Sequence, residues 1–125
     1  MVSLIDPKTL LHIEGFSAKR VAWLKNKVLS EGVWTKPLCI ERDHRLVMDG
    51  QHRMEVALAL GLSAVPCLLF DYHDVDVWSL RHTEEVTREL VIQRSLEGNI
   101  YPYKTAKHGF PIEMPVLDIP LERLR

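Results

Sequence analysis

Apolar and polar positions along this chain follow two different periods, which together predict an α+β fold. Strands are expected where short apolar runs, or runs that alternate with polar residues, are bounded by polar or proline-containing breaks. Such runs occupy residues 2–5, 36–42, 45–50, 65–72 and 75–80. The run at 65–72 is apolar almost throughout, which predicts a strand in the centre of the sheet, buried on both faces.

The first expected helix follows Ser17, whose side chain is a good N-cap, and ends at Gly32. Its apolar face is formed by Val21, Leu24, Val28 and Leu29. The spacing of these residues matches the 3.6-residue period of a helix that packs on a core.

Two further helices are expected. The second begins at Gln51 and is closed by Gly61, with Val56, Ala57 and Leu60 as its apolar positions. The third begins after Thr83, because carboxylates follow in its first turn, and it ends at Gly98. Residues 98–125 contain four prolines and show little periodicity, which predicts an extended C-terminal arm. The prediction is therefore a compact domain with a small mixed sheet, about three flanking helices and this arm.

Composition limits both the size and the partners of this domain. A chain of 125 residues, 46% of them hydrophobic and 26% charged, fits one globular domain over residues 1–125. The 16 Lys and Arg residues are balanced by 17 Asp and Glu residues, so nucleic acid is an unlikely partner. Cys39 and Cys67 lie far apart in apolar runs and are expected in the core. No apolar run reaches the ~20 residues of a membrane span, and residues 1–7 lack the features of a signal peptide, which predicts a cytoplasmic protein.

The junction between the strand at 45–50 and the following helix carries three polar side chains. If Asp49 caps this helix, unpaired N–H groups at the positive helix end favour an anion such as phosphate. Arg53 offers a bidentate fork for phosphate, and His52 can exchange a proton near neutral pH. The alternative is that Asp49 is only a cap, His52 a half-buried turn residue and Arg53 a surface charge. The spacing alone leaves both interpretations open.

The motif "DGQHR" at this junction occurs together with the Glu-bearing loop "HIEGF", the segment "EGVWTKPL", the strand "LGLSAVPCLLFDY" and the tail "YPYKTAKHGF". This set resembles the ParB/sulfiredoxin-like superfamily, and within it the free L-serine kinases, whose junction usually is Asp-Gly-His-His-Arg. The likeness covers about residues 2–80 and 96–124. Gln51 replaces the first histidine of the motif, and Ala106 stands where the kinases have a second threonine.

This resemblance implies a kinase that transfers a phosphoryl group from ADP or ATP, with Mg²⁺, to the hydroxyl of free L-serine or a related amino acid. It implies that Glu14 is the catalytic carboxylate and that Asp49 positions substrate or Mg²⁺, with His52 as a third catalytic residue. The residues implied to bind nucleotide phosphates are Lys36, Gly50, Gln51, His52, Arg53, Lys104 and Thr105. The amino acid is expected to contact Trp78 and His108.

Other members of the superfamily fit less well. A sulfiredoxin needs a cysteine immediately before the His-Arg pair, where this chain has Gln51. A ParB partition protein needs a helical DNA-binding domain after this one, and a nuclease needs a carboxylate cluster that the sequence lacks. A nucleotide- or effector-binding regulator without catalysis, with DNA or protein as its output, remains an alternative to the kinase.

The two departures in the motifs and a short middle segment leave further points open. Ala106 lacks one hydroxyl expected to bind the amino acid, so the identity of the acceptor is open. The segment between the "FDY" strand and the tail is shorter than in the kinases, so a homodimer or a partner protein could complete the site. The histidines at positions 12, 44, 73 and 82 lack the mutual spacing of metal ligands and are expected on the surface or in loops.

Overall fold

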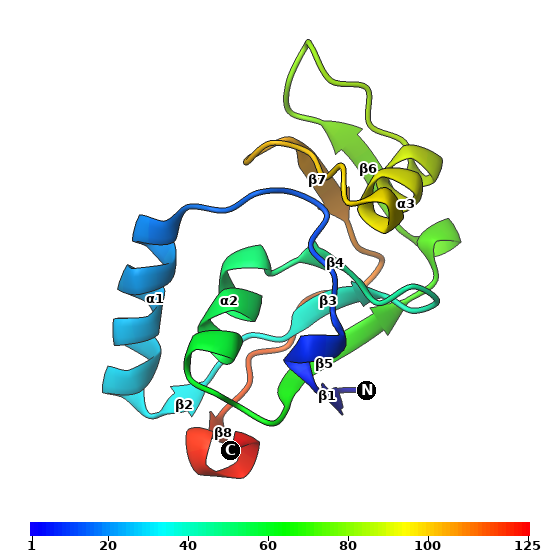
Figure 1. Ribbon diagram of the computed structural model, residues 1–125. Helices are drawn as coiled ribbons and strands as arrows, with labels where there is room; N and C mark the ends of the chain where they lie inside the picture. Colours follow the sequence, from blue (N-terminus) through cyan, green and yellow to red (C-terminus); the bar gives the residue numbers. More distant parts are fainter.

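The computed structural model describes residues 1–125 and contains a mixed four-stranded sheet (Figure 1). Its strands are β1 (Ser3–Ile5), β3 (Leu38–Glu41), β4 (Leu46–Asp49) and β5 (Val65–Phe70), in the order β1-β5-β3-β4. β5 runs parallel to β3, whereas the β1–β5 and β3–β4 pairs are antiparallel. The expected central position of the apolar strand at 65–72 is therefore confirmed.

Both faces of this sheet are covered by core residues, which explains why its strands are apolar at successive positions. In β3, Leu38 and Ile40 belong to one buried cluster, while Cys39 between them belongs to the other. In β4, Val47 faces the first cluster and its neighbours Leu46 and Met48 face the second.

The first cluster is covered by α1 (Ala18–Glu31) and α2 (Gln51–Ala59), which lie side by side in Figure 1. Ser17 caps α1 as predicted, since its hydroxyl accepts a hydrogen bond from Arg20 N at 3.2 Å. Gly32 ends the helix with φ 71°. The predicted inward position of Leu29 is wrong, because its side chain is 44% exposed.

The second cluster is covered by α3 (Arg88–Glu97), which contributes Val91. The predicted start of this helix at Thr83 is wrong. Thr87 is the N-cap, and its hydroxyl accepts a hydrogen bond from Leu90 N at 3.1 Å. The carboxylate of Glu84 lies outside the helix and pairs with Arg94 at 3.3 Å. The helix ends at Gly98 as predicted.

The C-terminal arm crosses the molecule and closes two small sheets. β7 (Ala106–Gly109) pairs with β6 (Asp76–Ser79), and β8 (Ile119–Pro120) pairs with β2 (Val33–Trp34). Short 3₁₀ turns occupy Pro7–Thr9, Tyr72–Asp74 and Leu121–Leu124. The last of these turns buries its two leucines in the cluster beneath α1 and α2. The arm is thus extended for much of its length but is fixed at several places.

Cys39 and Cys67 are buried free thiols, as predicted. Burial raises the pKa of each thiol to about 12, so both are protonated and unreactive near neutral pH. None of the helices combines the length and the apolar character that crossing a membrane requires.

Candidate active site

A cavity of about 500 Å³ lies where the loop before α1, the β4–α2 junction and the C-terminal arm meet. Its lining contains an excess of positive charge. The basic residues are Arg20, Lys36, Arg53, Lys104 and Lys107, against the acids Glu14 and Asp49. The other lining residues are Leu24, Met48, Gly50, Gln51, His52, Leu80, Tyr103 and Ala106. Such a concentration of cations attracts anionic ligands.

The β4–α2 junction presents the open amino end of a helix to this cavity. Asp49 is the last residue of β4, and Gly50 is the N-cap of α2, so the expectation that Asp49 caps the helix is wrong. No side chain caps α2, and its first intrahelical bond runs from Met54 N to Gly50 O at 2.8 Å. The N–H groups of residues 51–53 therefore precede the hydrogen-bonded part of the helix, where an anion can accept from them.

Glycine is required at position 50 by the backbone and by the packing. Its φ is 116°, a conformation that other L-residues rarely adopt. A Cβ added there would lie 2.8 Å from Leu38 Cγ. The missing side chain thus lets the chain turn tightly from β4 into α2 against β3.

His52 and Arg53 both line the cavity, but the imidazole of His52 is already engaged. Its Nε2 accepts a hydrogen bond from Ser17 N at 3.1 Å. Burial, followed by the charges of Arg20 and His12, lowers the pKa of His52. The ring is therefore neutral with its proton on Nδ1, and the expected proton exchange at Nε2 is not available in this arrangement.

The side chain of Gln51 points away from the cavity. Its Nε2 donates to the carbonyl of Val47 at 2.5 Å, and its Oε1 faces Nδ1 of His12 at 2.6 Å. Only the backbone N–H of Gln51 is left for a phosphate. His12 lies in a loop as predicted but is largely buried, and its Nε2 lies 2.8 Å from a carboxylate oxygen of Glu55.

Glu14 is fixed against the C-terminal arm at the wall of the cavity. Its Oε2 accepts from Lys104 N at 3.1 Å and its Oε1 from Ala106 N at 2.8 Å. Burial raises the pKa of Glu14, while the N–H groups of Ala106 and Lys104 oppose this effect. A carboxylate with a raised pKa in a cationic cavity is suited to accept a proton.

Three of the predicted site residues lie outside the lining of this cavity. Thr105 is fully buried, and its hydroxyl donates to the carbonyl of Pro102 at 2.6 Å. His108 is also buried, with Nε2 at 2.6 Å from the hydroxyl of Tyr72, and burial lowers its pKa to about 4. Trp78 is 45% exposed and lines a separate hollow beside the start of α3. None of these three side chains belongs to the lining of the cavity.

Seven lining residues were not among the predicted site residues: Arg20, Leu24, Met48, Leu80, Tyr103, Ala106 and Lys107. Arg20 lies one helical turn before Leu24, which was predicted to face inward, so the helical period alone could have found it. The ring of Tyr103 stands edge-on to His52, with centroids 5.4 Å apart. Tyr103 and Lys107 belong to the arm, and no local pattern indicates that this segment returns to the helix start.

Replacing Arg20 with alanine is expected to raise the dissociation constant for a nucleotide by about 10-fold to 100-fold, because a charged hydrogen bond contributes about 1.5–3 kcal/mol. The measurement is a calorimetric titration with ATP. Lys19→Ala is the matched control, since Lys19 precedes Arg20 on α1 but does not line the cavity. Equal losses of nucleotide affinity in both variants would show that Arg20 acts only through the overall positive charge of this surface.

No family model matches the chain. Two curated proteins are similar to part of it, and both are named ATP-dependent L-serine kinase. The protein from Staphylothermus marinus is 37% identical over 78 residues, and that from Desulfurococcus mucosus is 32% identical over 78 residues. Each match covers 59% of this chain and 31% of the relative, so the chain spans about a third of the length of these relatives.

Solved structures resemble nearly the whole chain. A free serine kinase in complex with AMP superposes with a TM-score of 0.90 at 15% identity, over 99% of this chain and 93% of the other. A mutant of a free serine kinase in complex with ADP gives a TM-score of 0.89 at 15% identity, over 99% and 94%. The predicted α+β fold, with its mixed sheet and three helices, is confirmed by this likeness.

Proposed function

We propose that this protein is a kinase that transfers a phosphoryl group from ATP or ADP to the hydroxyl of free L-serine or a related hydroxylated amino acid. One observation carries the proposal: the carboxylate of Glu14 lies on the wall of the same cavity as an open helix start and five basic residues. A phosphoryl donor and a base for the acceptor hydroxyl can thus meet in one place. The partial match to proteins named L-serine kinases supports this choice of substrate.

Binding of the donor is assigned to the cationic part of the cavity. The N–H groups at the start of α2 and the guanidinium of Arg53 bind phosphate oxygens, and Lys36, Lys104 and Arg20 supply further positive charge. Burial lowers the pKa of Arg53, which reflects the cost of removing the guanidinium from water. An anionic phosphate offsets that cost, so the arrangement favours a bound nucleotide.

In the transfer step, the hydroxyl oxygen of the amino acid forms a bond to the terminal phosphorus as the bond to the bridging oxygen breaks. The bridging oxygen leaves with the nucleotide, and the hydroxyl proton passes to Glu14. Proton transfer can accompany phosphoryl transfer, so a carboxylate is a sufficient base. The positive charges around the phosphates stabilise the transition state.

A role for Mg²⁺ depends on Asp49. Its exposed carboxylate lines the cavity and makes no side-chain hydrogen bond or ion pair with the protein. No group of three His, Cys, Asp or Glu side chains is placed to hold a metal ion. One carboxylate nevertheless fits magnesium, which binds through one or two carboxylates together with water and substrate phosphates. Bound Mg²⁺ would neutralise the charge on the phosphates.

The remaining parts of the proposal concern the family and the assembly. We place the chain in the ParB/sulfiredoxin-like superfamily, as one nucleotide-binding domain over residues 1–125 with residues 98–125 as its arm. We expect the protein in the cytoplasm, where both the nucleotide and the amino acid occur. We also expect a homodimer, because the segment between β5 and β7 is short and a second copy could complete the site. Analytical ultracentrifugation measures the oligomeric state directly.

The test is a turnover assay with Mg²⁺ and either ATP or ADP, against serine, threonine, homoserine and related hydroxy compounds, with phosphorylated products detected by mass. A product from one acceptor supports the kinase and identifies its substrate and donor. Nucleotide binding without product from any acceptor favours the non-catalytic regulator, in agreement with the departures at Gln51 and Ala106. Absence of nucleotide binding contradicts the kinase and leaves only a regulator that binds a different effector.

A further inference from the structure

His12 connects the loop that carries Glu14 with helix α2 through both of its ring nitrogens. Nδ1 lies 2.6 Å from Gln51 Oε1, and Nε2 lies 2.8 Å from Glu55 Oε2. The His12 side chain is 17% exposed and that of Glu55 27%. Two short contacts to residues one helical turn apart leave the ring a single orientation.

Both partners of this ring are acceptors. The amide of Gln51 cannot be turned round, because its Nε2 donates to the carbonyl of Val47, and an oxygen in that place would face another oxygen. Its Oε1 is therefore the atom that faces His12. The carboxylate of Glu55 has no proton to donate. Each ring nitrogen of His12 must carry a proton, which makes the ring an imidazolium.

We infer that His12 is a positively charged cross-link that positions the Glu14 loop against the first turn of α2. The loop residue two positions after His12 is the proposed base, and the helix residues that it holds flank the proposed phosphate site. The charge on His12 and its two contacts do not depend on any function, whereas the effect of His12 on catalysis rests on the proposed kinase function.

The groups around His12 agree with a charged ring. From α2, Glu55 supplies the negative charge and Gln51 a neutral oxygen. His52 is the other titratable group nearby on α2, and its pKa is lowered in part by the charge on His12. Within the loop, the ring of Phe16 lies 5.0 Å from that of His12, centroid to centroid. An aromatic ring of this kind favours a cation beside it.

The protonation state can be measured without any substrate. Nitrogen-15 spectra of the histidine rings distinguish an imidazolium from either neutral tautomer, and the signals of His12 are those missing in His12→Asn. In the native protein near neutral pH we expect two protonated nitrogens for His12. In Glu55→Gln, whose amide can donate, we expect one. A neutral tautomer for His12 in the native protein would overturn the inference.

Kinetics then test the positioning role. We expect Glu55→Ala, which removes one of the two contacts of the ring, to lower kcat by about 10-fold to 100-fold, because misplacing a catalytic group by about 1 Å has effects of this size. Its KM for nucleotide should change little. Glu55→Gln keeps the contact through its amide and should restore most of the lost kcat. A loss confined to KM, or a Glu55→Gln variant as impaired as Glu55→Ala, contradicts the role.

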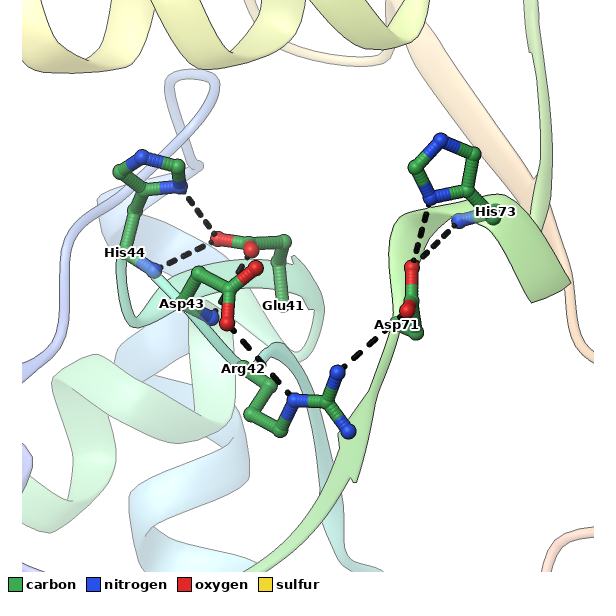
Figure 2. A network of polar contacts seen from close by, with 6 residues as sticks. All are labelled: Glu41, Arg42, Asp43, His44, Asp71 and His73. Atoms are coloured by element: carbon green, nitrogen blue, oxygen red, sulfur yellow. Dashed lines mark hydrogen bonds and ion pairs between the residues drawn. The ribbon is translucent and has the colours of Figure 1, made fainter.

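The matched control is Asp71→Ala, and the native Asp71 is labelled in Figure 2. Asp71 also pairs with a histidine, His73 at 3.0 Å, but that ring is 89% exposed and the pair does not line the cavity. The control should keep the native kcat and KM. If the protein phosphorylates no acceptor, the spectra still decide the charge on His12, so failure of the kinase proposal and failure of this inference are distinguishable.

Discussion

Replacing Glu14 with glutamine is expected to lower the rate of phosphoryl transfer by about 10²-fold to 10⁴-fold, the usual contribution of a general base. Glutamine has nearly the same size but cannot accept the hydroxyl proton. The phosphates are assigned to the start of α2 and the basic side chains, so the dissociation constant of the nucleotide should change by no more than a few-fold. Single-turnover transfer and calorimetric titration measure the two quantities separately.

Glu14 also holds the arm, and that second role needs its own control. Its two oxygens accept from Lys104 N and Ala106 N, and a glutamine can accept with only one of its terminal atoms. The amide resonances of these two residues report whether the arm has moved. The pH profile of the native protein adds an independent check. Because burial raises the pKa of Glu14, transfer should begin to fail at a higher pH, as the pH is lowered, than it would with an ordinary glutamate. Unchanged turnover in Glu14→Gln would remove this residue from the mechanism.

Gly50→Ala is expected to have the largest effect on stability, with a loss of about 2–5 kcal/mol in the free energy of unfolding. A left-handed backbone costs a residue with a Cβ about 1–2 kcal/mol, and overpacking costs about 1–3 kcal/mol more. Both apply here, because φ is 116° and the added Cβ would lie 2.8 Å from Leu38 Cγ. Urea denaturation measures the loss, and nucleotide affinity should fall with it because the start of α2 is displaced.

Gly61→Ala separates the two costs. Gly61 also has a positive φ, 64°, but nothing lies within 4 Å of the position of an added Cβ. We expect this variant to lose only about 1–2 kcal/mol, the backbone contribution alone. If the two variants are equally destabilised, the contact with Leu38 has no role and the turn at Gly50 is set by its backbone conformation.

Much of the fold was predictable because its strands and helices are encoded locally. The apolar run that became β5 indicated a central strand, and Ser17 and Gly32 marked both ends of α1. The start of α3 was missed for a physical reason. Thr83 and Thr87 are equivalent as local caps, but Glu84 forms an ion pair with Arg94 on the side of α3 instead of taking part in its first turn.

The candidate site was only partly predictable because it is assembled from distant segments. The motif from Asp49 to Arg53 and the acid Glu14 came from a family resemblance, and the structure brings them to one cavity. Their chemical roles stay predictions. The contact between His12 and Gln51 joins residues 39 positions apart, and that between Glu14 and Ala106 joins residues 92 apart. No rule based on sequence spacing predicts contacts between residues so far apart. Trp78 illustrates the opposite error, because its residue type suggested a contact with the substrate but it lines a different hollow.

The attachment of the C-terminal arm has a consequence for how the protein folds. Residues 103, 104, 106 and 107 form one wall of the cavity at the start of α2, while the end of the arm is fixed beyond the other end of α2, where Ser63 N and Ala64 N donate to the carbonyl of Leu124. Contacts so far apart in sequence form late and slow the folding of a chain. The wall of the cavity that the arm forms is therefore expected to be completed late in folding. A ligand that binds there recognises the native state alone, so its binding energy adds to the global stability of the molecule.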